Sequence, residues 1–192
     1  MWLIAGLGNP GPKYEGTRHN LGFWALELIS RRWGIPFARH SGFIDQGQGR
    51  YGTEDILLVK PLEYMNRSGE VLEPLVRREG IEMNRIVVIF DDMDLPLGTV
   101  RFKKRGGSGG HRGMDSIIRR LGSEDIKRIR LGIGRPGNTG ENVDYVLSKV
   151  TRKESPVVGR MLETAADLAE RAISEGEMDT VTMNLTEAEE EL

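Results

Sequence analysis

The stretch Ile86-Val87-Val88-Ile89-Phe90 constrains the fold most strongly, because five consecutive apolar residues end abruptly at Asp91-Asp92. A strand that is apolar on both faces is buried between two layers, which is typical of a parallel sheet covered by helices on both sides. Such a sheet places the groups that follow its strands along one edge, where the sites of α/β proteins gather. We therefore expect a polar site at the end of this strand.

Segments of strand length and helical segments alternate along the remainder of the chain. Short apolar runs at 3–5, 55–59, 100–103 and 129–133 predict strands, and apolar residues three to four apart predict helices at 20–33, 68–78, 114–121 and 157–173. Gly34 and Gly80 directly follow two of these helices, as helix stop signals do. The order predicts the α/β class, with a single domain at 1–176 that has a twisted, mixed and largely parallel central sheet flanked by helices.

The composition excludes several kinds of protein and of site. The 192 residues include no cysteine, which rules out a disulfide, a thiolate zinc site and a cysteine nucleophile. No apolar run approaches the roughly 20 residues that a membrane helix needs, and no secretory signal is visible at the start. We therefore expect a cytoplasmic protein with no membrane partner.

Charge is distributed unevenly, although the net charge is only −2. Residues 99–135, defined as the basic sector, hold eleven lysines and arginines against three acids, whereas 177–192 hold six acids and no base. A basic sector on a nearly neutral protein favours a polyanionic partner, and an ordinary solvated face explains it equally well. The acidic segment 177–192 is poor in large apolar residues and predicts a frayed C-terminal tail.

Residues 6–11 spell G-L-G-N-P-G, which fits the G-x-G-x-x-G fingerprint of dinucleotide-binding turns. Such a turn leads straight into a helix whose N–H groups bind the pyrophosphate, with an acidic residue about twenty positions further on. Here Pro10 and Pro12 stiffen the loop, helical spacing begins only near Asn20, and no acid closes a second strand at that distance. The glycine pattern is therefore a weak indication of a nucleotide.

One further pattern fits a known motif without its context, and the histidines fit no motif. Residues 106–110 fit the G-x-S-x-G nucleophile elbow, but 103–105 are basic where an apolar strand should precede, and His111 follows too closely. The three histidines, His19, His40 and His111, lack the spacing of metal ligands. We predict a flexible glycine turn and no metal site.

Four motifs in this chain resemble, in the same order, those of the bacterial peptidyl-tRNA hydrolases. They are GLGNPGPKYEGTRHNLGF (6–23), KPLEYMNRSG (60–69), DDMDLPLGTVRFKKRGGSGGHRG (91–113) and RIRLGIGRP (128–136). The resemblance covers nearly the whole chain. It implies a monomeric α/β enzyme, without metal or cofactor, that cleaves the ester between a peptide and the 3′ ribose of tRNA. Such an enzyme recycles tRNA after premature drop-off from the ribosome.

By matching position, the resemblance implies roles for four polar residues. His19 matches the general base that takes a proton from the attacking water. Asp91 matches the acid that orients this imidazole and stabilises its charged form. Asn9 matches a catalytic amide that separates peptidyl-tRNA from aminoacyl-tRNA, whose amine is free and charged, and Asn66 matches a second amide that places the substrate.

The same matching implies further contacts to the substrate. Lys103 and Arg130 match the residues that bind the tRNA 5′-phosphate, which gives affinity without reading sequence. Contacts to the peptide and to the terminal adenosine of the CCA end are implied for Tyr14, Tyr64 and Met65. Peptidyl-tRNA is thus the expected partner, and no obligate protein partner is expected.

Arg112 departs from the family pattern, which commonly has asparagine there to fix the water or the product carbonyl. Arginine carries donors and a permanent charge but no acceptor. It can stabilise the oxyanion that develops on the ester, or bind a phosphate and leave the water to Asn66.

A second interpretation is a non-catalytic RNA-binding relative of the same fold, and a nucleotide-dependent oxidoreductase is the third. The presence of His19, Asp91, Asn9 and Asn66 together favours the enzyme, because every role in the reaction is then filled.

Overall fold

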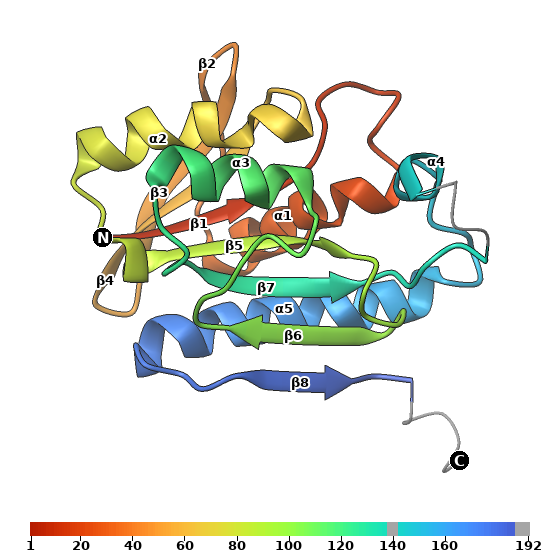
Figure 1. The fold of residues 1–192 in the computed structure, drawn as a ribbon. Coiled ribbons are helices and arrows are strands. Elements are labelled where there is room, and N and C mark those ends of the chain that lie inside the picture. Colours follow the sequence, from red (N-terminus) through yellow and green to blue (C-terminus); the bar gives the residue numbers. More distant parts are fainter. Residues whose placement is uncertain (138–141, 187–192) are drawn as a thin grey trace.

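The computed structural model describes residues 1–137 and 142–186, which form one eight-stranded sheet with helices on both faces (Figure 1). The strands are β1 (Trp2–Gly6), β2 (Ala38–Ser41), β3 (Ile44–Tyr51), β4 (Glu54–Pro61), β5 (Ile86–Asp92), β6 (Thr99–Lys103), β7 (Lys127–Gly132) and β8 (Val181–Asn184). The α-helices are α1 (Leu21–Trp33), α2 (Ser68–Glu79), α3 (Arg112–Leu121), α4 (Asn142–Val146) and α5 (Ser155–Glu175). Short 3-10 turns are η1 (Arg18–Asn20), η2 (Met65–Arg67) and η3 (Met83–Arg85).

The strand order is β2-β3-β4-β1-β5-β7-β6-β8, with parallel strands at the centre. Strands β4, β1, β5 and β7 run parallel, whereas β2, β3, β6 and β8 pair antiparallel on the two sides. The predicted α/β class with a mixed, largely parallel sheet is confirmed. No helix in the described parts of the chain is both long enough and apolar enough to span a membrane.

Alternate residues of β5 enter two separate cores, which explains the continuous apolar run. Val87 and Ile89 pack with α1 and α5 on one face, whereas Ile86, Val88 and Phe90 pack with α2 and α3 on the other. All five are buried. Both faces of the strand are therefore shielded from water. The next residues of the strand, Asp91 and Asp92, lie at the end of the sheet.

The glycines of the opening fingerprint serve close packing and a turn. A Cβ on Gly6 would lie 2.2 Å from the carbonyl oxygen of Gly22 in α1, and one on Gly8 would lie 2.7 Å from the ring of Phe23. Gly11 has a φ of +103°, which favours glycine. The pattern that fits a dinucleotide turn is thus explained by the close approach of α1 to the end of β1.

The segment after α5 differs from the expected frayed tail. Residues Val181–Asn184 form β8, which pairs with β6, and Met178 before it is buried. Lys104 of the basic sector also lies 3.2 Å from Glu177 and 3.5 Å from Asp179. The composition suggested a solvated tail, but backbone pairing, one buried methionine and opposite charge hold the segment on the sheet. The final residues, 187–192, lie outside the described part.

Candidate active site

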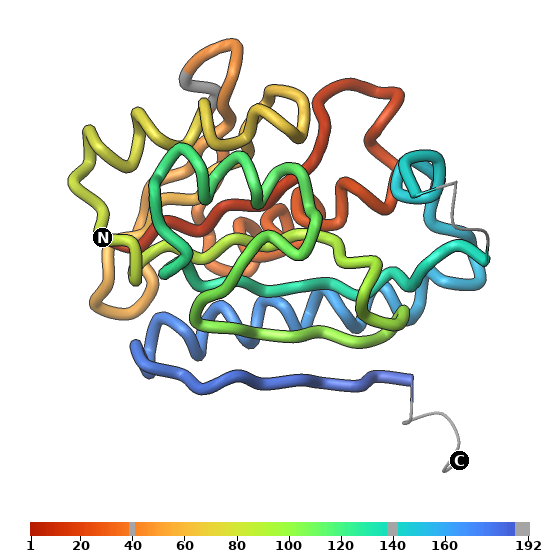
Figure 2. Tube along the Cα trace, in the orientation of Figure 1, coloured from red at the N-terminus to blue at the C-terminus, as the bar shows by residue number. Residues whose placement is uncertain are grey.

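The candidate site lies at the end of the sheet where β1, β5 and β7 terminate, which Figure 1 shows on the right. The loop after β1 arches beyond this end and comes close to α4 in Figure 2. A cavity of about 530 Å³ opens there between the loop and η1, η2, the end of β5, the glycine turn before α3, and α4. Segments that are far apart in the sequence therefore contribute to one pocket.

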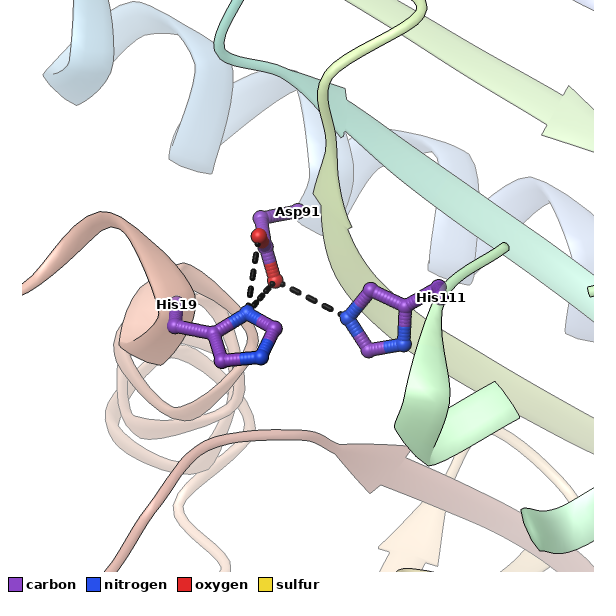
Figure 3. A group of neighbouring side chains, drawn as sticks. All are labelled: His19, Asp91 and His111. Atoms are coloured by element: carbon purple, nitrogen blue, oxygen red, sulfur yellow. Dashed lines mark hydrogen bonds and ion pairs between the residues drawn. The ribbon is translucent and has the colours of Figure 1, made fainter. Parts of the chain in front are cut away.

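His19 and Asp91 form a hydrogen-bonded pair in the lining of this cavity. The Nδ1 atom of His19 lies 2.8 and 2.9 Å from the two carboxylate oxygens of Asp91 (Figure 3). A carboxylate only accepts hydrogen bonds, so Nδ1 carries the proton and, in the neutral ring, Nε2 keeps its lone pair. His19 lines the cavity. The ring is therefore oriented to take a proton from a water molecule.

Asp91 remains a carboxylate although it is buried. Burial alone would raise the pKa of its side chain, but the neighbouring imidazoles of His19 and His111 more than offset burial and hold the pKa well below its usual range. The side chain is 2% exposed. A buried negative charge with hydrogen-bond partners suits a group that stabilises an imidazolium.

His111 is a third member of the cluster, and the sequence reasoning gave it no role. Its ring lies beside that of His19 and contacts the same carboxylate oxygen of Asp91, with Nε2 3.0 Å from Oδ1 (Figure 3). It is also the N-cap residue of α3. The signal in the sequence was the position of His111 directly before a helix start, in a glycine-rich turn.

Asn9 is held by two neighbours, which decides the direction of its amide. The backbone N–H of Met65 donates to Asn9 Oδ1 at 2.7 Å, so Nδ2 is the group that is left for a substrate. The side chain of Asn20 also binds both backbone polar groups of Asn9, at 2.9 and 3.0 Å. Asn9 therefore presents N–H donors to the cavity.

The structure brings together most of the predicted site residues. With His19, Asp91 and Asn9, the cavity is lined by Tyr64, Met65, Asn66 and Arg112. Tyr64 is 58% exposed, whereas Met65 is buried. Tyr14 does not line this cavity, and its ring lies 5.5 Å from Lys13 Nζ. Lys103 and Arg130 also lie outside it, on neighbouring strands β6 and β7.

Part of the basic sector lies on the neighbouring strands β6 and β7. Arg101 faces Arg130 and Lys103 faces Arg128 across the antiparallel pair, so four positive charges share one face of the sheet. Arg128 is buried and donates to the carbonyl of Gly107 at 2.7 Å, which fastens the glycine turn. Burial lowers the pKa of Arg128 to about 10. This face therefore combines three half-buried basic side chains with one buried, structural arginine.

Arg130 is not an isolated cation. Its guanidinium is paired with Asp92, whose side chain turns away from Asp91 and lines the cavity. The Arg130 side chain is 15% exposed. Asp92, to which the sequence analysis assigned no role, thus connects the cavity with the basic face.

Arg18 fixes the segment that follows α4. Its backbone N–H donates to the carbonyl of Ser148, and its guanidinium donates to Ser148 Oγ and to Glu154, each at 3.0 Å. The guanidinium also lies 4.9 Å from the ring of Tyr145. The residue next to His19 thereby connects η1 with α4 and with the segment that follows it.

His19, Asp91 and His111 are residue types that can bind a transition metal, and their donor atoms lie within 4.8 Å of one another. The ring nitrogens that face Asp91 already lie at hydrogen-bond distance from it, so an ion would have to displace two N–H protons. Metal independence stays a prediction.

Comparison with known proteins identifies the family of the chain. The family model described as peptidyl-tRNA hydrolase matches residues 3–191. A peptidyl-tRNA hydrolase from Geobacillus thermodenitrificans is 46% identical over 176 residues, which cover 91% of this chain and 94% of the relative. One from Bacillus subtilis is 42% identical over 174 residues, covering 91% and 93%. The solved peptidyl-tRNA hydrolase from Acinetobacter baumannii is 33% identical, covers 92% of each chain and gives a TM-score of 0.83. The chain therefore belongs to the peptidyl-tRNA hydrolase family.

Proposed function

We propose that this protein hydrolyses the ester between the peptide and the 3′ ribose of peptidyl-tRNA, with His19 as the general base. The observation that carries the proposal is the hydrogen bond from His19 Nδ1 to Asp91, because in the neutral ring of this cavity-lining residue it leaves the lone pair on Nε2. In the cell the reaction recycles tRNA from prematurely released peptidyl-tRNA. The proposed setting is the cytoplasm, and the proposed working form is a monomer.

The reaction needs no covalent intermediate on the protein. The water oxygen attacks the ester carbonyl as Nε2 takes a water proton, which leaves an imidazolium whose charge Asp91 stabilises. The Nδ2 donors of Asn9 support the oxyanion of the tetrahedral intermediate. When the intermediate collapses, the imidazolium returns its proton to the departing 3′ oxygen of the ribose, and the free peptide acid and tRNA result.

The surroundings of the cavity supply the substrate contacts of the proposal. Tyr64 offers an exposed ring at the rim for stacking, and Asn66 offers an amide beside Arg112. Arg112 is exposed at the first position of α3 and lines both this cavity and an adjoining groove between α2 and α3. We assign it to a phosphate of the acceptor end, because a guanidinium offers several donors to phosphate oxygens.

Turnover of N-acetyl-aminoacyl-tRNA in the presence of EDTA tests the proposal. We expect wild-type activity to persist with EDTA, and His19→Ala to lower kcat by about 10²–10⁴-fold while tRNA binding is retained, since only the base is lost. Asp91→Asn should cost less, because it disturbs orientation and charge without removing the base. Near-wild-type turnover by His19→Ala would contradict the mechanism.

The RNA-binding alternative gives a different result in the same assay. A non-catalytic relative would bind tRNA and release none of it from the acylated substrate, with or without His19. A metal-dependent enzyme would lose turnover in EDTA and regain it when a divalent ion is added back.

A further inference from the structure

The two ring nitrogens of His111 have different partners, and this fixes its tautomer. The backbone N–H of Met114 donates to Nδ1 at 3.2 Å, whereas Nε2 lies 3.0 Å from Asp91 Oδ1. A nitrogen that accepts from a backbone N–H carries no proton, so the neutral ring carries its proton on Nε2. His111 therefore donates to Asp91 and accepts from the first turn of α3.

We propose that His111 is a positioning residue for the His19–Asp91 pair. It supplies a second N–H donor that holds the Asp91 carboxylate in place. Because the His111 ring stays neutral, the negative charge of that carboxylate stabilises only the protonated form of His19. The inference rests on the proposed function. Asp91 Oδ1 is shared by the two rings, whose centroids lie 5.1 Å apart. The His111 ring packs on Phe90 at 4.7 Å, and its side chain is 9% exposed. It has little freedom to turn away.

His111 can fill this role only with a neutral ring, because its Nδ1 accepts the hydrogen bond that caps the start of α3. An imidazolium at His111 would carry a proton on Nδ1, and the hydrogen bond from Met114 would be lost. Of the two imidazoles on Asp91, only His19 is therefore placed to take up a proton during the reaction.

The other charges around the cluster are paired or stand apart from the two rings. Asp92 pairs with Arg130 of β7, and Asp94 pairs with Arg135 after that strand. Arg18 beside His19 pairs with Glu154, and on α3 Asp115 pairs with Arg119, while Arg112 is exposed. None of these groups changes in the variants below, so a change in the pH profile reports on His111.

Two substitutions separate the two contacts of His111. His111→Asn places an amide oxygen near the position of Nδ1, where it can cap Met114, but the shorter side chain does not reach Asp91. His111→Gln places an amide N–H near the position of Nε2, where it can donate to Asp91, and loses the cap. Each variant is the control for the other.

For His111→Asn we expect a kcat about tenfold lower, with KM and melting temperature near wild type, because a charge-assisted hydrogen bond is lost and the cap is kept. Without the competing donor, Asp91 binds His19 more strongly and favours its protonated form. The acid limb of the kcat profile should therefore move to higher pH. His111→Gln should recover most of the turnover and the acid limb, with a melting temperature about 2–4 °C lower.

The outcomes distinguish this inference from the proposed function. If His111→Asn keeps the wild-type kcat and acid limb, and only His111→Gln is impaired, His111 is merely a helix cap and the inference is wrong. A second readout is independent of activity: nitrogen NMR of the imidazoles should show His111 protonated on Nε2, and a proton on Nδ1 would overturn the assignment. If His19→Ala retains turnover in the same assay, the proposed function itself fails.

Discussion

A buried carboxylate with two imidazole partners stabilises the fold only while it stays ionised, and Asp91 is such a residue. Its pKa in the folded protein lies below the ordinary value of about 3.9, so its contribution is complete above that pH and is lost as the pH falls toward the folded value. We expect Asp91→Asn to lower the free energy of unfolding by about 1.5–3 kcal/mol at pH 7. Urea unfolding of both proteins from pH 7 to pH 2 should show this difference shrinking below about pH 4.

Asp115→Asn is a matched control for that measurement. Asp115 lies on α3 and pairs with Arg119, but its side chain is 43% exposed. Exposed pairs contribute about 0–1 kcal/mol, so this variant should differ little from wild type at any pH. A difference for Asp91→Asn that stays constant down to pH 2 would show that the carboxylate is not selectively ionised by the fold.

At the scale of elements, the close approach of α1 to β1 places η1 and His19 over the end of β5. A Cβ on Gly22 would lie 2.3 Å from the carbonyl oxygen of Ile89 and 2.5 Å from the backbone nitrogen of Leu7. These two backbone atoms are hydrogen bonded to each other at 3.0 Å, so neither can give way cheaply. We expect Gly22→Ala to destabilise the protein by about 1–3 kcal/mol or more and to lower turnover, because α1 must shift with His19.

Gly159→Ala in α5 is the matched control, since it is the same change within a helix. No atom lies within 4 Å of the position of its Cβ. Alanine in an exposed helix interior is favoured over glycine by roughly 0.5–1 kcal/mol, so this variant should melt higher than wild type with unchanged turnover. Thermal melts and kcat of both variants are the measurement. Wild-type stability of Gly22→Ala would refute the packing argument.

The elements with a strong periodicity of apolar residues could be predicted from the sequence. The strands that form only because they pair with another strand were missed. Strand β3 contains Gln46-Gly47-Gln48-Gly49, which shows no apolar alternation, yet it pairs along the whole of β4. Its glycines serve tertiary packing, because a Cβ on Gly47 would lie 2.6 Å from the carbonyl oxygen of Pro36. Such contacts join residues from different segments of the chain, so the secondary-structure propensity of a short stretch does not predict them. The same applies to β8, whose partner β6 lies far away in the sequence.

The residues of the candidate site divide in the same way, into those predictable from a local motif and those whose role depends on the assembled molecule. His19, Asp91 and Asn9, which line one cavity, could be predicted as site residues because their motifs are local and resemble a known family. The role of Asp92 and the joint binding of Asp91 by two histidines depend on which side of β5 each carboxylate takes and on where α3 begins. These features arise only when the strand end, the glycine turn and η1 meet.

The basic face of β6 and β7 adjoins the cavity, because Arg130 on that face pairs with the cavity-lining Asp92. If Lys103 and Arg130 bind the 5′-phosphate, the contact is made before the chemical step and is held through it, so its loss should raise KM more than it lowers kcat. Arg130→Ala should raise KM more than Lys103→Ala, because it also leaves Asp92 as an unpaired negative charge near the phosphate. Both effects should shrink for tRNA without a 5′-phosphate and at high salt, where counterion release favours binding less.

Steady-state kinetics on phosphorylated and dephosphorylated N-acetyl-aminoacyl-tRNA decide this prediction. Lys153→Ala, an exposed lysine outside the basic sector, should behave as wild type on both substrates. The double variant Arg130→Ala with Asp92→Asn should have a lower KM than Arg130→Ala alone, because the repelling carboxylate is gone. That recovery separates electrostatic repulsion from a folding defect, which a second substitution would not repair. An unchanged KM for both single variants at low salt would mean that the basic sector is only a solvated face of the sheet.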